Sequence, residues 1–151
     1  MEHIILTANI GSASKKYTLF AENNRLLDVH FEHEGAGYLA TLTTQSGSSE
    51  EKISKEQFDQ AASFVLEHVK RHPALTAIGV RIVAPGGFFA KHRRIDDAYI
   101  AALTRAEEFA PLHVSATLTE IRELQRLFPN VPLIAASDSA FHSSMPEVAW
   151  R

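Results

Sequence analysis

Four short segments of the chain contain residue types that bind anions or handle protons. The first, residues 9–16 (NIGSASKK), combines small residues with two serine hydroxyls and two lysines. In a tight hairpin, such a segment exposes backbone N–H groups that can form a phosphate-binding nest. It does not have the G-x-x-x-x-G-K-[ST] pattern of a P-loop. A surface hairpin with solvated serine and lysine side chains is the alternative interpretation.

The second segment has an arginine inside an apolar run, residues 75–83 (LTAIGVRIV). Because an unpaired buried charge is costly, Arg81 needs a partner. Its planar guanidinium can hold a carboxylate or a phosphate through two parallel hydrogen bonds. An internal ion pair, or a side chain that reaches the edge of the strand, would explain the same pattern.

The other two segments contribute a histidine and an aspartate. Residues 110–113 (APLH) place His113 between two predicted helices, where a lone histidine is more often solvated or capping than catalytic. Residues 137–142 (SDSAFH) place Asp138 at the carboxyl end of a predicted buried strand. Open α/β sheets bind ligands at that edge, although a helix-capping aspartate is the competing explanation.

The first third of the chain, which carries the serine-rich segment, has the pattern of β-hairpins. Apolar and β-branched runs are separated by turns that contain Gly, Ser and Asn, which predicts strands at 3–9, 16–21, 26–32 and 38–44. The polar segment 45–52 (QSGSSEEK) is expected to be a surface loop.

The rest of the chain alternates between helical and strand-like patterns. Ser54 precedes Gln57 by three positions, which is the spacing of a capping box. Helical periodicity and capping residues predict three helices, over 54–71, from Asp96 or Asp97 onward, and over 115–128. Apolar runs predict buried strands at 75–83 and 131–136. This order predicts an α/β protein with a mixed sheet, antiparallel hairpins and helices on both faces.

Composition limits the classes of protein that need to be considered. A chain of 151 residues, 45% hydrophobic and 22% charged, is typical of one globular domain. Its formal net charge of -3 argues against nucleic-acid binding driven by basic charge. It contains no cysteine, and no apolar stretch approaches the ~18 residues that cross a bilayer. With no signal-peptide pattern at its start, we expect a cytoplasmic protein without membrane or nucleic-acid partners.

In their order and separation, the four segments resemble motifs of the acetate kinases and their propionate and butyrate kinase relatives. Residues 9–16 correspond to N-A-G-S-S-S-x-K, and residues 79–86 correspond to G-H-R-V-V-H-G-G. Residues 110–115 correspond to A-P-L-H-N-P, and residues 137–146 correspond to F-D-T-A-F-H-Q-T-M-P. The resemblance spans nearly the whole chain.

The resemblance implies an actin-like ATPase fold, related to sugar kinases and Hsp70, in which two duplicated domains enclose a cleft. Residues 1–151 would form the N-terminal domain, and the C-terminal domain of the family would be absent. The implied reaction transfers the γ-phosphoryl group of Mg-ATP to a short-chain carboxylate, acetate or propionate, giving an acyl phosphate and ADP. The implied cofactor is Mg²⁺ bound with ATP.

The resemblance also assigns roles to individual residues. They are Asn9 for the magnesium ion; Ser12, Ser14 and Lys16 for the nucleotide phosphates; Arg81, Val83, Leu112 and His113 for the acyl substrate; and Arg81 with Asp138 for catalysis. A carboxylate nucleophile has no proton to lose at neutral pH, because an unperturbed carboxyl pKa is about 4. We therefore interpret Asp138 as an orienting or electrostatic group more than a general base.

A non-catalytic phosphate- or carboxylate-binding module that keeps the fold is the alternative function. Val80 and Ala84 stand where the family motif has histidines beside Arg81, and Ser137 replaces the phenylalanine before Asp138. In either case catalysis needs both walls of the cleft. The expected partner is therefore a C-terminal half-domain or, failing that, a second copy of this chain.

Overall fold

The computed structural model describes residues 2–141, and its first part is a meander of antiparallel strands. These strands are β1 (Ile4–Ile10), β2 (Ser14–Ala21), β3 (Asn24–Glu34), β4 (Gly37–Thr44) and β5 (Gly47–Ile53). The four strands predicted from the sequence pattern are confirmed. Each is paired with its neighbour along the chain.

The prediction of a surface loop at 45–52 is wrong, because most of this segment forms β5. The strand pairs only with β4, from Thr44 opposite Gly47 to Tyr38 opposite Ile53. All of its residues except Ile53 are exposed. A strand at the sheet edge that buries almost nothing has no hydrophobic alternation, and therefore its sequence looks like a loop.

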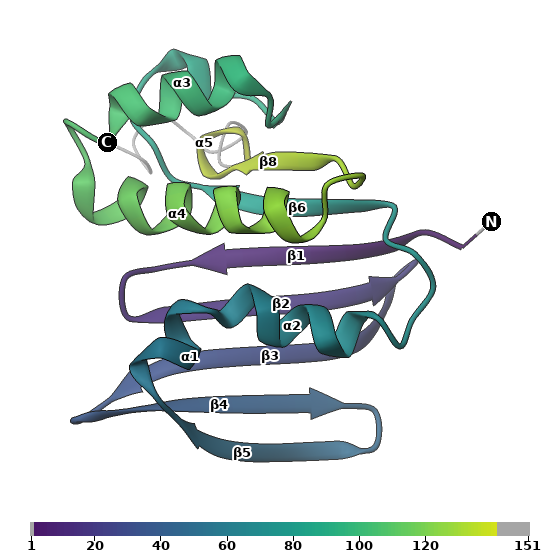
Figure 1. The fold of residues 1–151 in the computed structure, drawn as a ribbon. Helices are drawn as coiled ribbons and strands as arrows, with labels where there is room; N and C mark the ends of the chain where they lie inside the picture. The colour runs from purple at the N-terminus through teal and green to yellow at the C-terminus, as the bar shows by residue number, and fades with distance from the viewer. Residues whose placement is uncertain (1, 142–151) are drawn as a thin grey trace.

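The second part of the chain completes the sheet and adds the helices. Its elements are α1 (Lys55–Asp59), α2 (Ala61–Val69), β6 (Ala77–Ile82), a 3₁₀ turn η1 (Gly87–Phe89), β7 (Arg93–Arg94), α3 (Asp97–Ala106), α4 (Pro111–Leu127), β8 (Leu133–Ser137) and α5 (Asp138–Phe141). The eight strands lie in the order β5-β4-β3-β2-β1-β6-β8-β7 (Figure 1). Since β1, β6 and β8 are mutually parallel and the other pairs are antiparallel, the predicted mixed sheet is confirmed.

Capping residues fix the start of two helices as predicted. Ser54 accepts a hydrogen bond from the Gln57 N–H at 3.1 Å, and the Gln57 side chain accepts one from the Ser54 N–H at 2.8 Å. Asp96 caps α3 by accepting from the Tyr99 N–H at 2.8 Å. The single helix predicted over 54–71 is divided, however, because Gln60 leaves the helical region with φ -99° and ψ 28°.

Helix α4 begins four residues earlier than the predicted start at Ser115. Pro111 occupies its first turn, where a fixed φ and a missing N–H carry no penalty. His113 therefore lies in the first turn of a helix and not, as predicted, in a loop between two helices.

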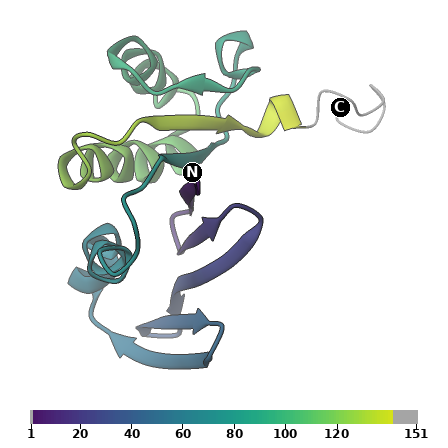
Figure 2. The same ribbon diagram turned by 90° about the vertical axis from the view of Figure 1, so that its right-hand side faces the viewer.

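The two faces of the sheet differ in what covers them. On one face, here called the covered face, side chains of β1, β2 and β6 alternate into the core beneath α1, α2 and α4, while α3 packs beside α4 (Figures 1 and 2). The opposite, open face has no helix of residues 2–141 packed on its centre, so the prediction of helices on both faces is not met within this part of the chain. Several positions on the open face are small or polar, including Thr7, Asn9, Gly79 and Arg81. Ile5, on the same side of β1 as Thr7 and Asn9, is 36% exposed.

Candidate active site

The carboxyl ends of the parallel strands β1, β6 and β8 meet the first turns of α4 at one edge of the sheet (Figure 1). Ligands bind at this edge in open α/β sheets. A cavity of about 290 Å³ lies there, lined by Asn9, Ile10, Gly11, Arg81, Val83, His113, Thr117 and Asp138. Five of the predicted site residues, Asn9, Arg81, Val83, His113 and Asp138, are therefore brought together from four elements and one connection.

An ion pair between Arg81 and Asp138 lies in this cavity. Arg81 donates from Nε at 2.9 Å and from Nη2 at 2.8 Å, both to Oδ1 of Asp138. The Arg81 side chain is 48% exposed and that of Asp138 is 29% exposed. Because ion pairs so open to solvent contribute at most about 1 kcal/mol, an anionic ligand can compete for the guanidinium.

Hydrogen bonds around Ser137 hold the strand end from which Asp138 leaves. The Ser137 N–H donates to Nδ1 of His92 at 2.9 Å, and its hydroxyl donates to the carbonyl oxygen of Phe89. The same hydroxyl accepts from the Ala140 N–H at 3.1 Å. Ser137 thus joins β8 to the η1 segment. The sequence offered no signal for this role of His92, since it joins residues 45 positions apart.

The β1–β2 hairpin forms a second side of the site. Its tip closes through a 2.8 Å hydrogen bond from the Gly11 N–H to the Ser14 carbonyl oxygen. A Cβ at Gly11 would lie 3.3 Å from that oxygen, so a larger residue would strain the turn. The N–H groups of Ser12 and Ala13 donate no hydrogen bond to any described residue, and therefore remain available to a ligand.

The two neighbouring lysines of β2 point to opposite faces. Lys16 lies opposite Asn9 in the strand register, is exposed on the open face, and makes no ion pair with the residues that the structure describes. Lys15 is buried on the covered face. The open face thus carries an uncompensated positive charge beside Asn9.

The remaining predicted residues lie outside the cavity itself. Ser12, Ser14 and Lys16 are exposed on the adjacent hairpin, and Leu112 is 78% exposed at the start of α4. Thr117 does line the cavity but was not predicted. It lies one turn after His113 and donates to the His113 carbonyl oxygen at 3.1 Å. The spacing of four would have identified it had the helix been predicted to begin at Pro111. Residues 142–146 of the fourth motif lie outside the described residues.

Oxygen donors at the site fit a magnesium ion only in part. The Asn9 amide oxygen and the Asp138 carboxylate both line the cavity. Within residues 2–141, no group of three or more His, Cys, Asp or Glu side chains is arranged to hold a metal. Since Mg²⁺ commonly uses one or two carboxylates together with substrate phosphates and water, these donors fit an ion that arrives with a nucleotide. No helix in that range is long and apolar enough to cross a lipid bilayer.

The fold and site define an α/β domain with a cavity at the edge where its parallel strands end, and this cavity holds the Arg81–Asp138 ion pair. The model of the Acetokinase family matches residues 4–151, and the chain belongs to this family. It is 33% identical to an acetate kinase of Caldanaerobacter subterraneus subsp. tengcongensis and 36% identical to one of Streptomyces avermitilis, and each match covers 97% of this chain. The chain spans only 39% of the length of these relatives.

Solved structures of two related kinases have the same fold. Acetate kinase of Porphyromonas gingivalis matches with a TM-score of 0.81 and 27% identity, over 99% of this chain and 40% of that one. A propionate kinase of Francisella tularensis subsp. tularensis matches with a TM-score of 0.80 and 26% identity, over 97% of this chain and 39% of that one. The chain therefore has the actin-like ATPase fold of these kinases, as predicted.

Proposed function

We propose that this chain forms one wall of an acyl-phosphate kinase active site. The reaction would transfer the γ-phosphoryl group of Mg-ATP to acetate or propionate, and a C-terminal half-domain would supply the opposite wall. The observation that carries this proposal is the solvent-accessible Arg81–Asp138 pair, in a cavity at the carboxyl edge of the sheet. Membership of the Acetokinase family, and relatives named acetate and propionate kinase, support the choice of reaction.

Arg81 and Asp138 would act through charge and position. When substrate enters, the Arg81 guanidinium would exchange part of its contact with Asp138 for the carboxylate and the transferring phosphoryl group. The carboxylate oxygen forms the new bond to phosphorus while the bond from phosphorus to the ADP oxygen breaks. Phosphoryl transfer depends mainly on such positioning and neutralisation of charge. Asp138 would orient Arg81, and no base is needed for a nucleophile that is already ionised.

The β1–β2 hairpin would hold the nucleotide phosphates. Backbone N–H groups of Ser12 and Ala13 are available there, and the hydroxyls of Ser12 and Ser14 are exposed. Lys16 would add positive charge from the open face. Mg²⁺ would supply charge neutralisation for the phosphates when bound, and Asn9 would take part in holding it.

An ADP-formation assay tests the proposal directly. The chain would be mixed with the C-terminal part of the Caldanaerobacter relative, and acetate, propionate and butyrate would be offered with Mg-ATP. We expect turnover in the mixture and none in either part alone. Asp138→Asn should reduce turnover by about 100-fold or more, because a misplaced guanidinium misaligns the reacting groups.

The control is Lys70→Met, which removes an exposed ion pair with Glu67 at the end of α2 and should leave turnover unchanged. Unchanged turnover in Asp138→Asn would contradict the role given to that carboxylate. An absence of ADP formation in every mixture, including with a second copy of the chain at high concentration, would contradict the enzymatic proposal as a whole.

A non-catalytic binding module is the second candidate, and one observation favours it. Arg81 already has an anionic partner within the chain, so its charge is balanced without any substrate. Calorimetric titration with Mg-ADP and with acetate separates the two functions. Binding to the chain without turnover in any mixture would identify the module.

A further inference from the structure

We propose that Glu120 is a positioning residue, which ties the phosphate-binding hairpin to helix α4 and so sets the width of the site. The inference rests on the proposed function for its ligand, but its structural part can be measured without one. Glu120 lies outside the cavity that contains Arg81 and Asp138. It acts through Lys15 and Tyr17 on β2.

Glu120 is joined to β2 by two buried contacts. Its Oε2 lies 2.9 Å from Nζ of Lys15, and the side chains of the two residues are 2% and 9% exposed. Its Oε1 accepts a hydrogen bond from the hydroxyl of Tyr17, which is also buried. Burial and the nearby Glu120 charge raise the pKa of Tyr17 well above its usual value, so this hydroxyl remains a donor. We name these three residues the covered-face cluster.

The covered-face cluster is connected to both sides of the site by short stretches of regular structure. Lys15 lies opposite Ile10 in the register, immediately beside the hairpin tip at 11–14. On α4, Glu120 follows Thr117 by three positions and His113 by seven, a spacing that places all three on one side of the helix. A shift of Glu120 relative to Lys15 therefore moves the hairpin tip relative to Thr117 and His113.

An open space lies between the hairpin tip and the first half of α4. A second cavity, of about 500 Å³, lies on the covered side and is lined by Gly11, Ser12, Lys15, Ser115, Thr119 and Glu120, among others. Side chains do not fill this space, and the cluster links β2 to α4 beside it through buried polar contacts. Lys15 is held further by the ring of Phe58, 5.0 Å from its Nζ. A buried ion pair adds little net stability, because removing its charges from water is costly. We therefore assign Lys15 and Glu120 the role of fixing the position of β2 relative to α4.

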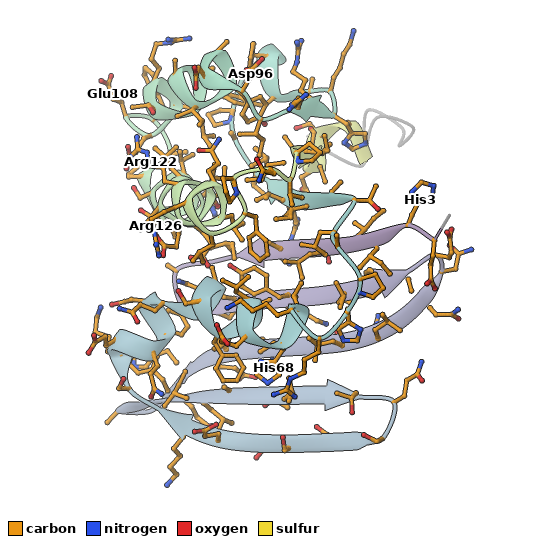
Figure 3. The ribbon with its side chains drawn as sticks, turned by 45° about the vertical axis from the view of Figure 1, so that its right-hand side comes forward. His3, His68, Asp96, Glu108, Arg122 and Arg126 are labelled. Atoms are coloured by element: carbon orange, nitrogen blue, oxygen red, sulfur yellow. The ribbon has the colours of Figure 1, made fainter. Side chains whose placement is uncertain are left out.

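The first test measures the separation of the hairpin from α4 in solution. The chain contains no cysteine, so Ala13→Cys and Arg122→Cys can carry a pair of spin labels. Figure 3 shows Arg122 pointing away from the sheet, on the outer side of α4. In Lys15→Met/Glu120→Leu, which removes both charges, we expect the distance distribution to broaden or shift by several ångström. In the matched control Glu67→Leu/Lys70→Met, an exposed pair on α2, it should not change.

The second test measures Mg-ADP affinity, which we expect to fall about tenfold in Lys15→Met/Glu120→Leu and not in the control. A folded double variant with an unchanged distance distribution overturns the inference. A changed distribution in a chain that never binds Mg-ADP supports the positioning role and counts against the proposed function instead. If the double variant does not fold, Tyr17→Phe replaces it, and an unchanged distribution and affinity in that variant overturn the inference.

Discussion

Two clusters of polar residues flank the β1–β2 hairpin, and they differ in how their charges are used. The open-face cluster consists of Asn9, Lys16, Arg81 and Asp138. In the covered-face cluster every charged group has a buried partner, whereas Lys16 has no partner among the described residues. Neighbouring lysines in one strand thus have opposite roles, because the alternation of the strand sends one into the core and the other to solvent.

The ion pairs of the two clusters differ in burial more than in the distance between their charged atoms. Lys15–Glu120 and Arg81–Asp138 have nearly equal separations, 2.9 Å and 2.8 Å. The first is enclosed and the second is about half open to water. A buried pair cannot be broken without leaving an uncompensated charge, while an exposed pair can be exchanged for a ligand. The first arrangement suits scaffolding and the second suits binding.

The largest effect is expected from breaking the buried pair on one side. Glu120→Leu leaves Lys15 buried without its anion, and should reduce the free energy of unfolding by about 3–5 kcal/mol in urea denaturation. Glu67→Leu, which breaks an exposed pair on α2, should change it by less than about 1 kcal/mol. Equal losses in the two variants would contradict the distinction between enclosed and open pairs.

Two tyrosine hydroxyls provide a smaller and sharper contrast. Tyr17→Phe removes a donor to a buried carboxylate, and should lower the free energy of unfolding by about 1–3 kcal/mol. The hydroxyl of Tyr99 is buried without a hydrogen-bond partner among the described residues. Tyr99→Phe should therefore be neutral or stabilising in the same measurement. A loss for Tyr99→Phe as large as that for Tyr17→Phe would refute this comparison.

On the open face, removing a charge should affect binding and not folding. Arg81→Gln is expected to change the free energy of unfolding by less than about 1 kcal/mol, since its ion pair is half exposed. Titration of the same variant with Mg-ADP and acetate should show weakened acetate binding. A strongly destabilised Arg81→Gln protein would mean that the open-face cluster is structural, like the covered one.

A last contrast is expected only at alkaline pH, through Tyr99. Burial raises the pKa of Tyr99 to about 12, from 10 for the free side chain. The unfolded chain therefore loses this proton first, and the contribution of Tyr99 to stability is complete below pH 10 and lost as the pH rises to about 12. Urea midpoints of Tyr99→Phe should fall less steeply over this window than those of the wild type. An equal decline of the urea midpoint with pH in Tyr99→Phe and in the wild type would contradict the raised pKa of Tyr99.

Much of the fold could be predicted because local patterns agree with tertiary contacts. The apolar periodicity that predicted the helices corresponds to their buried sides, with Phe58, Val65, Leu103 and Ile121 all buried. Ser54 and Asp96 cap helices as their spacing indicated. These features depend on neighbours within one or two turns, which a sequence displays directly.

The features that were missed depend on contacts between residues far apart in the sequence, or belong to a strand whose side chains stay exposed and so show no hydrophobic alternation. Strand β5 forms only because β4 offers it an unpaired edge. The partnership of Lys15 with Glu120 joins positions 105 residues apart, and nothing in the local sequence of either residue indicates it. For the site, the motifs named five residues that line the cavity, whereas the predicted Ser12, Ser14, Lys16 and Leu112 lie outside it. An ion pair of Arg81 was one of the alternatives, but neither Asp138 as its partner nor the place of Thr117 was predicted.

Both outer strands of the eight-stranded sheet carry charge or are very short. At one margin, β5 presents Glu50, Glu51 and Lys52 to solvent, and at the other, β7 consists of Arg93 and Arg94 alone. Unpaired strand margins invite another chain to add to the sheet, and charged or brief margins oppose this addition. Within residues 2–141, both margins of the sheet therefore oppose fibril-like aggregation by strand addition.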